Sequence, residues 1–156
     1  MEVTKAGYSK SADYYNLILV EFSIWGILTW ANPEMNSSKE AEKLRNDDFW
    51  RYIQHVCSVL RLQRRHLGIY RQSEFSPGKK WHCHFIIAKR GTEAVASAAL
   101  AATLRDDWRN GRADIREIDI TKAREGIDYQ SKPQGDCRIY TPALERMIKD
   151  AREETL

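Results

Sequence analysis

Runs of β-branched and aromatic residues mark the strands that the sequence predicts. Residues 17–30 predict either one long strand with a bulge or two strands joined by a turn, with Gly26 in the middle. Residues 67–75 and 80–88 alternate apolar and polar positions on the two sides of a Ser-Pro-Gly turn, and this pattern predicts a β-hairpin. The isoleucines of residues 113–120 alternate with charged residues and predict a further strand.

Apolar residues at the helical period predict a long amphipathic helix over about residues 38–64. Ser37 and Glu40, three residues apart, form a capping-box pattern at its start. A second helix is predicted over the alanine-rich residues 93–109, with Thr92 as its N-cap and an Asn-Gly pair after its end.

The C-terminal part of the chain predicts two more helices. Residues 121–132 predict a short helix closed by Pro133. Thr141 and Pro142 form a cap and first-turn pair for a last helix over residues 142–154. Because these helices are inserted between strands of hairpin type, the sequence predicts an α+β sandwich with a mainly antiparallel sheet.

Length and composition restrict the class of protein. The chain has 156 residues, of which 42% are hydrophobic and 30% charged, so we expect one folded domain over residues 1–156. The net charge of +3 permits a phosphate-rich partner without requiring one. The most apolar stretch, residues 17–31, has about 15 residues, fewer than the ~20 that a membrane-spanning helix needs. We therefore expect no membrane partner. The three cysteines have no short spacing typical of a zinc site or a disulfide framework, and the N-terminal residues 1–10 are polar, so we expect an intracellular protein.

The most informative local pattern is Trp81-His82-Cys83-His84. Alternate residues of a strand lie on one face, ~6.6–6.8 Å apart, so His82 and His84 point to the same side while Cys83 points to the core. Glu74 lies near the end of the preceding predicted strand, and the hairpin can bring it back beside both histidines. Two imidazoles and a carboxylate suit Mg²⁺ or Mn²⁺ acting as a Lewis acid on a phosphate oxygen. In the alternative interpretation, the histidines are an exposed pair on the polar side of a strand.

Tyr129 and Lys132 form a second pattern, Tyr-Gln-Ser-Lys, on the predicted short helix. Residues three apart share a helix face, so the ammonium group of Lys132 can favour the phenolate form of Tyr129. A tyrosine activated in this way can form a covalent intermediate. Alternatively, Tyr129 packs against the apolar side of its helix and Lys132 is an ordinary solvated residue.

Together, the two patterns resemble the HUH endonucleases, and among them the single-tyrosine replication initiators (Rep proteins) of rolling-circle plasmids and small single-stranded DNA replicons. The matching order covers about residues 67–135. Residues 25–31, with Thr29 in the middle, stand where this family has a hydrophobic first motif. The resemblance implies a five-stranded antiparallel central sheet, with the histidine strand near its middle and the tyrosine helix lying over it.

The resemblance also implies a site and a reaction. Glu74, His82 and His84 would hold the divalent ion, Mn²⁺ or Mg²⁺, at the scissile phosphate of single-stranded or hairpin origin DNA. Tyr129 would attack that phosphate, leaving a 3′-hydroxyl and a 5′-phosphotyrosine link that a later 3′-hydroxyl reverses. Lys132 would position or stabilise the reacting phosphate. Such nicking and joining initiates rolling-circle replication, in the cytoplasm of a bacterial or archaeal host or wherever the replicon is copied.

Basic and aromatic residues around the histidine strand predict DNA contacts, because Lys and Arg neutralise phosphates and aromatic rings stack on unpaired bases. The predicted contact residues are Thr29, Trp30, Arg64, Arg65, Lys79, Lys80, Trp81, Lys89 and Arg90, with Tyr70 as a further stacking candidate. The sequence contains no GxxxxGK[ST] phosphate-binding loop, so we expect a separate host or partner helicase to unwind the DNA.

Three other functions fit the same residues. The first is a single-tyrosine HUH transposase or relaxase of a mobile element. The second is a non-catalytic nucleic-acid-binding module in which the histidines are structural. The third is a Zn²⁺ hydrolase that uses the histidines and does not need Tyr129.

Overall fold

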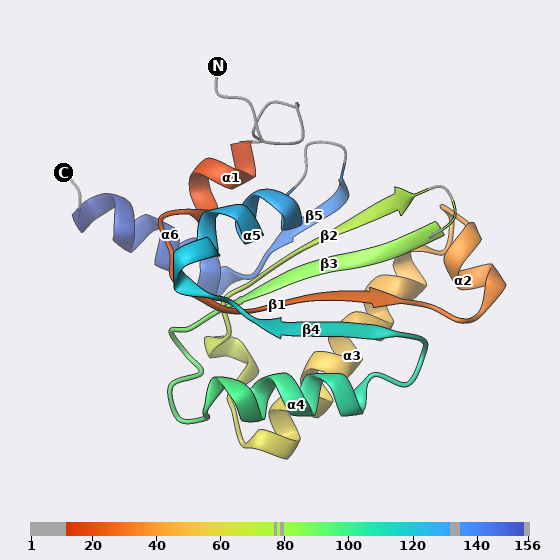
Figure 1. Cartoon of the computed structure of the whole chain (residues 1–156), viewed down its shortest axis with the longest axis horizontal. Helices are drawn as coiled ribbons and strands as arrows, with labels where there is room; N and C mark the ends of the chain where they lie inside the picture. Colours follow the sequence, from red (N-terminus) through yellow and green to blue (C-terminus); the bar gives the residue numbers. More distant parts are fainter. Residues whose placement is uncertain (1–11, 77, 79, 132–134, 155–156) are drawn as a thin grey trace.

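Five strands form one antiparallel sheet with helices on both of its faces (Figure 1). The computed structural model describes residues 12–76, 78, 80–131 and 135–154. The strands are β1 (Phe22–Thr29), β2 (Ile69–Ser76), β3 (Lys80–Ala88), β4 (Ala113–Glu117) and β5 (Asp136–Tyr140). They lie in the order β4-β1-β3-β2-β5, so the histidine strand β3 is central. The predicted α+β fold with an antiparallel sheet is confirmed.

The helices form two layers, one on each face of the sheet (Figure 1). They are α1 (Ala12–Leu17), α2 (Pro33–Ser37), α3 (Glu42–Leu60), α4 (Ser97–Asp107), α5 (Ala123–Gln130) and α6 (Pro142–Glu154), with single 3-10 turns at Arg64–His66 and Ile120–Lys122. One apolar core joins α3 and α4 to one face, where β3 contributes Cys83, Phe85 and Ile87. A second core joins α1, α5 and α6 to the other face, where β3 contributes Ile86 and Ala88. Because side chains alternate along β3, His82 and His84 lie on this second face.

The N-terminal predicted strand is shorter than expected. Residues 12–17 form α1 and the chain turns before β1 begins at Phe22. Gly26 lies within one continuous strand, where a Cβ atom would lie 2.5 Å from the ring of Phe85 and 2.7 Å from Ile115. The irregularity in the pairing of β1 with β3 lies instead between Phe22 and Ile24. Gly26 therefore permits close packing and makes neither the bulge nor the turn that we predicted.

The predicted helix starts are wrong at two places. The long helix begins at Glu42 with Ala41 as its N-cap and without a side-chain cap, whereas Ser37 ends α2. Likewise, α4 begins after Ala96 and not after Thr92. The hydroxyls expected to cap these helices make other hydrogen bonds: Ser37 donates to the carbonyl oxygen of Pro33, and Thr92 to that of Lys89.

Other predicted boundaries agree closely with the structure. β3 and α6 occupy residues 80–88 and 142–154 as predicted, and the Oγ1 atom of Thr141 accepts a hydrogen bond from the backbone N–H of Leu144 at 3.3 Å. The predicted strand 113–120 ends at Glu117. The prediction missed α1, α2 and β5. Within the described residues, no helix is both long enough and apolar enough to span a membrane.

Two fully buried arginines connect α3 to the sheet. Arg71 of β2 and Arg45 of α3 are 0% and 1% exposed. Both pair with Glu42, at 3.3 Å for Arg71 and 2.9 Å for Arg45. The hydroxyl of Ser73 also donates to Glu42, at 2.7 Å. Burial by itself would raise the pKa of Glu42, but the hydrogen bond from Ser73 and the charges of Arg71 and Arg45 lower it below its ordinary value.

Candidate metal centre and active site

Glu74, His82 and His84 converge on the buried face of the β2–β3 hairpin. Glu74 lies directly opposite His82 in the register of β2 with β3, and His84 follows two residues later on the same face. The Oε2 atom of Glu74 lies 2.7 Å from Nε2 of His84 and 3.6 Å from Nε2 of His82. The two Nε2 atoms are 3.0 Å apart. All three residues are buried, and the structure therefore brings the predicted ligands together.

Hydrogen bonds at the opposite ring nitrogens orient both imidazoles. Nδ1 of His82 lies 3.1 Å from the carbonyl oxygen of Lys80, which can only accept, so Nδ1 donates; in a neutral ring this leaves the lone pair on Nε2. Nδ1 of His84 lies 2.7 Å from Oε1 of Gln130, which favours the same tautomer. Burial lowers the pKa of His84, because the imidazolium would lose its hydration, so the ring is neutral at pH 7.

The group therefore presents three electron-pair donors to one point. Two nitrogens 3.0 Å apart match neighbouring ligands that are each ~2.1 Å from a shared ion. Without a proton or a cation between them, three such donors repel one another. The buried Glu74, His82 and His84 group can thus hold a metal ion.

Gln130 links this group to helix α5, and sequence analysis did not identify it. Its side chain is fully buried, and its Oε1 atom accepts from His84 while its amide nitrogen has no partner among the described residues. We expect Gln130→Ala to weaken Mn²⁺ affinity about 10–100-fold, since His84 loses the contact that fixes its ring. Isothermal titration calorimetry measures this change, with the exposed Gln63→Ala as the matched control. Equal affinities of the two variants would contradict this role.

Tyr129 lies at the surface beside Glu74, His82 and His84, which are called the metal group below. Helix α5 places it next to Gln130, and its ring centroid is 5.5 Å from that of His84 in an edge-to-face arrangement. The side chain is 42% exposed, unlike the three candidate ligands. A molecule at the surface can therefore reach the phenol and the edge of the metal group together. Lys132, the predicted partner of Tyr129, lies outside the described residues.

A groove of about 510 Å³ runs past Tyr129 and His82. Lys80 and Arg112 supply basic groups to its lining, and Asp114 supplies an acidic one. Thr29 lies opposite His82 in the register of β1 with β3 and also lines the groove. Its hydroxyl accepts from the backbone N–H of Arg112 at 3.1 Å, which fixes the start of β4 against β1. The sequence analysis missed Arg112 because it is distant from every motif.

Two predicted stacking residues are not available to bases, and this corrects the prediction. Trp30 is 3% exposed, packs edge-to-face on Trp108 and donates its indole N–H to Asp48. Tyr70 is fully buried. Their ring faces contact other side chains of the core, which the aromatic character of the sequence could not distinguish from surface exposure.

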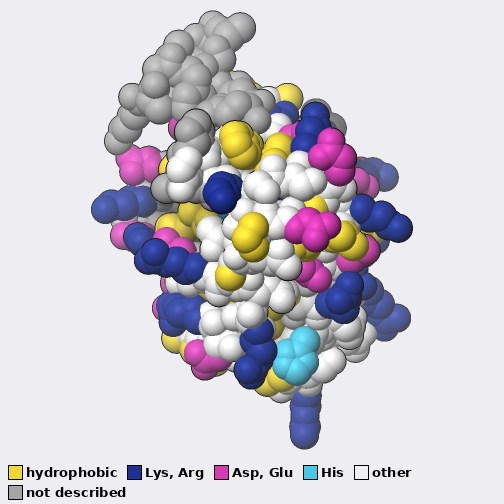
Figure 2. All heavy atoms as spheres, turned by 90° about the vertical axis from the view of Figure 1, so that its right-hand side faces the viewer, with side chains coloured by type: hydrophobic (Ala, Val, Ile, Leu, Met, Phe, Trp, Pro, Cys, Tyr) yellow, Lys and Arg dark blue, Asp and Glu magenta, His cyan; other side chains and the backbone are white. Residues whose placement is uncertain are grey.

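Trp81 and Lys80 lie at the tip of the hairpin. Trp81 is half-buried between the ring of Phe75, 5.5 Å away, and the guanidinium of Arg45, 5.0 Å from its centroid. Lys80 is exposed, and Lys79 lies outside the described residues. Figure 2 shows the surface at this end of the sheet, where basic side chains are interspersed with acidic ones.

The other predicted DNA contacts lie at the opposite end of the sheet. Lys89 and Arg90 follow the last residue of β3, ~23 Å along the strand from His82. Lys89 pairs with Glu21 at 3.5 Å and Arg90 with Asp150 at 3.2 Å. The exposed Arg64 and Arg65 precede β2, whose far end carries Glu74. The structure therefore separates these four residues from the metal group.

Comparisons of the chain with protein-family models, curated proteins and solved structures found no match.

Proposed function

We propose that this protein is a metal-dependent enzyme that nicks and rejoins single-stranded DNA through a covalent link to Tyr129. The observation that carries the proposal is the exposed tyrosine beside a buried Glu74, His82 and His84 group, with Tyr129 and His82 lining one groove. The residue order also resembles the single-tyrosine HUH replication initiators. Initiation of rolling-circle replication, together with a separate helicase, is the biological role that this resemblance supports.

The three buried residues would hold Mg²⁺ or Mn²⁺, and the bound ion would polarise an oxygen of the scissile phosphate. Tyr129 supplies the nucleophile. Its phenol loses a proton to water, and its oxygen forms a bond to phosphorus while the bond from phosphorus to the 3′-oxygen breaks. The 3′-oxygen then takes up a proton. The reverse reaction, by a 3′-hydroxyl of another end, releases Tyr129 and joins the strands.

Residues of the groove position the strand. Lys80 and Arg112 can neutralise phosphates on either side of the reacting one. Gln130 anchors the tyrosine helix to His84, so the nucleophile and the metal group keep a fixed separation.

Wild-type protein incubated with Mn²⁺ and a pool of labelled single-stranded oligonucleotides tests the proposal. We expect a labelled protein band on a denaturing gel that disappears with EDTA. Peptide mapping by mass spectrometry should locate the link at Tyr129, and sequencing of the attached strand should give the nick site. Tight binding without any adduct across a diverse pool would favour a non-catalytic module. Metal-dependent cutting without an adduct would identify water as the nucleophile and favour a hydrolase.

A further inference from the structure

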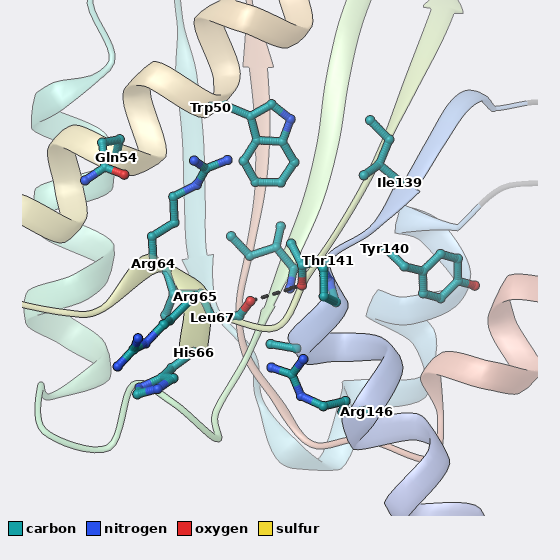
Figure 3. A pocket seen from close by; sticks show the side chains of 13 residues that line it. Trp50, Gln54, Arg64, Arg65, His66, Leu67, Ile139, Tyr140, Thr141 and Arg146 are labelled. Atoms are coloured by element: carbon teal, nitrogen blue, oxygen red, sulfur yellow. Dashed lines mark hydrogen bonds between the residues drawn. The ribbon is translucent and has the colours of Figure 1, made fainter.

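A separate pocket of about 700 Å³ lies at the other end of β2 (Figure 3). Its walls come from α3, the turn before β2, β5 and the start of α6. Ile69, the first residue of β2, lines this pocket, whereas Glu74 lies five residues later, ~17 Å along the strand. The volume falls within the ~300–1,000 Å³ that is typical of small-molecule sites. The pocket is therefore a distinct candidate binding site.

The charged residues that line the pocket are all basic. Arg64, Arg65 and Arg146 surround it, together with His66, and no acidic residue is among the described residues of its lining. None of the three arginine side chains makes an ion pair or a hydrogen bond with another described residue. The positive charge is therefore uncompensated within this part of the protein, which favours an anionic ligand.

The remaining surface of the pocket is apolar and partly aromatic. Trp50 forms one wall, with the guanidinium of Arg64 stacked over it at 5.0 Å. Ile139 faces Trp50 from β5, and Leu67 and Pro142 also contribute to the lining. A planar apolar group fits beside these side chains, while an attached anionic group can reach the arginines. An aromatic base joined to a phosphate has this combination.

We propose that the pocket binds a nucleotide of the single-stranded DNA away from the nick site, with its phosphate paired to Arg64 and Arg146 and its base beside Trp50. The choice of a DNA strand as the source of the nucleotide rests on the proposed function. Since the pocket lies ~17 Å from Glu74 along β2, the strand must extend over several nucleotides to reach both sites. The second contact would then hold the strand during cutting and rejoining.

The test compares the Arg64→Gln/Arg146→Gln double variant with wild type in binding fluorescein-labelled oligodeoxythymidine. EDTA is present throughout, so the result does not depend on cleavage or on Tyr129. We expect the affinity to fall at least ~10-fold. The slope of log affinity against log salt should decrease in magnitude by about 0.7, the value for one lost phosphate contact, because both arginines pair with the same phosphate. The control, Arg109→Gln/Arg124→Gln, removes two exposed arginines outside the pocket and the groove and should change the affinity less than about twofold. Unchanged thermal melting confirms that both variants fold.

Binding of thymidine monophosphate distinguishes a nucleotide of a DNA strand from a free nucleotide as the ligand of the pocket. If the pocket binds nucleotides, thymidine monophosphate should bind weakly to wild type and should not bind to the Arg64→Gln/Arg146→Gln variant. The variant could instead lose thymidine monophosphate binding and keep its affinity for the DNA strand. This result would overturn the strand proposal and assign the pocket to a free nucleotide. If the variant binds both the oligonucleotide and thymidine monophosphate as tightly as wild type does, the pocket is not a nucleotide site. The two proposals can also fail separately. If the double variant loses strand binding but wild type forms no covalent adduct in the separate assay, the binding site is supported and the nicking function is refuted.

Discussion

Tyr129→Phe should reduce the covalent DNA adduct at least about a thousandfold, as expected when a nucleophile is removed. The variant keeps the aromatic ring, which lies edge-to-face with His84, so the metal group retains its neighbour. Because the side chain is 42% exposed, we expect a change in stability within about 0.5 kcal/mol. Affinities for Mn²⁺ and for single-stranded DNA should stay within about threefold of wild type. The denaturing-gel assay measures the adduct, urea denaturation the stability, calorimetry the affinity for Mn²⁺, and fluorescence anisotropy the affinity for DNA.

Tyr15→Phe is the matched control, since Tyr15 is similarly exposed at 44% but belongs to α1. We expect it to form the adduct at the wild-type rate. Metal-dependent cutting that persists in Tyr129→Phe would show that the tyrosine is not the nucleophile. Loss of DNA binding together with the adduct would show instead that Tyr129 acts mainly by contacting the strand.

Glu42→Gln should lower the free energy of unfolding by about 3–5 kcal/mol. The substitution leaves Arg45 and Arg71 buried without their shared carboxylate. Arg71 still donates a hydrogen bond to Oδ1 of Asn46, and Arg45 to the carbonyl oxygen of Ser38, but these neutral acceptors do not balance two positive charges. Urea denaturation followed by circular dichroism measures the change.

The pH dependence gives an independent check of this ion pair. Because the pKa of Glu42 is lowered in the folded protein, its stabilisation is present above its ordinary pKa of 4.5 and is lost as the pH falls through the lower folded value. The difference between wild type and Glu42→Gln should therefore shrink below about pH 4.5. Glu117→Gln, at an exposed position of β4, serves as the control with little expected change. A pH-independent difference would indicate that Glu42→Gln acts by disturbing packing and not by removing a charge.

The elements that the sequence predicted correctly are those whose own residues determine their secondary structure. β3 combines β-branched and aromatic residues with a turn before it, and α6 has both a cap and an apolar stripe. In contrast, β5 has only five residues, Asp-Cys-Arg-Ile-Tyr, and is held by pairing with β2. Helix α2 begins at an Asn-Pro pair, where Oδ1 of Asn32 accepts from the N–H of Glu34, but its five residues are too few to show a helical period in the sequence.

The metal group was predictable because its three residues lie within one hairpin. Strand periodicity places His82 and His84 on one face, and the turn length brings Glu74 opposite. Gln130 and Arg112 reach the site only through the packing of α5 and the pairing of β4 with β1. Similarly, burial of Trp30 and Tyr70 depends on which helices cover them, and residue type does not report this.

The sheet order separates the assembly of the protein into an early and a late stage. The β2–β3 hairpin closes a very short loop, so its pairing has the smallest entropic cost. The same hairpin carries Glu74, His82 and His84, the three candidate metal ligands. β1 is synthesised first, yet its partners β3 and β4 begin only at Lys80 and Ala113. At roughly 5–20 residues per second on the ribosome, β1 waits for seconds with both edges unpaired. A nascent chain can thus bring Glu74, His82 and His84 together before the groove exists, and Tyr129 joins them only after α5 has been synthesised, more than 40 residues later.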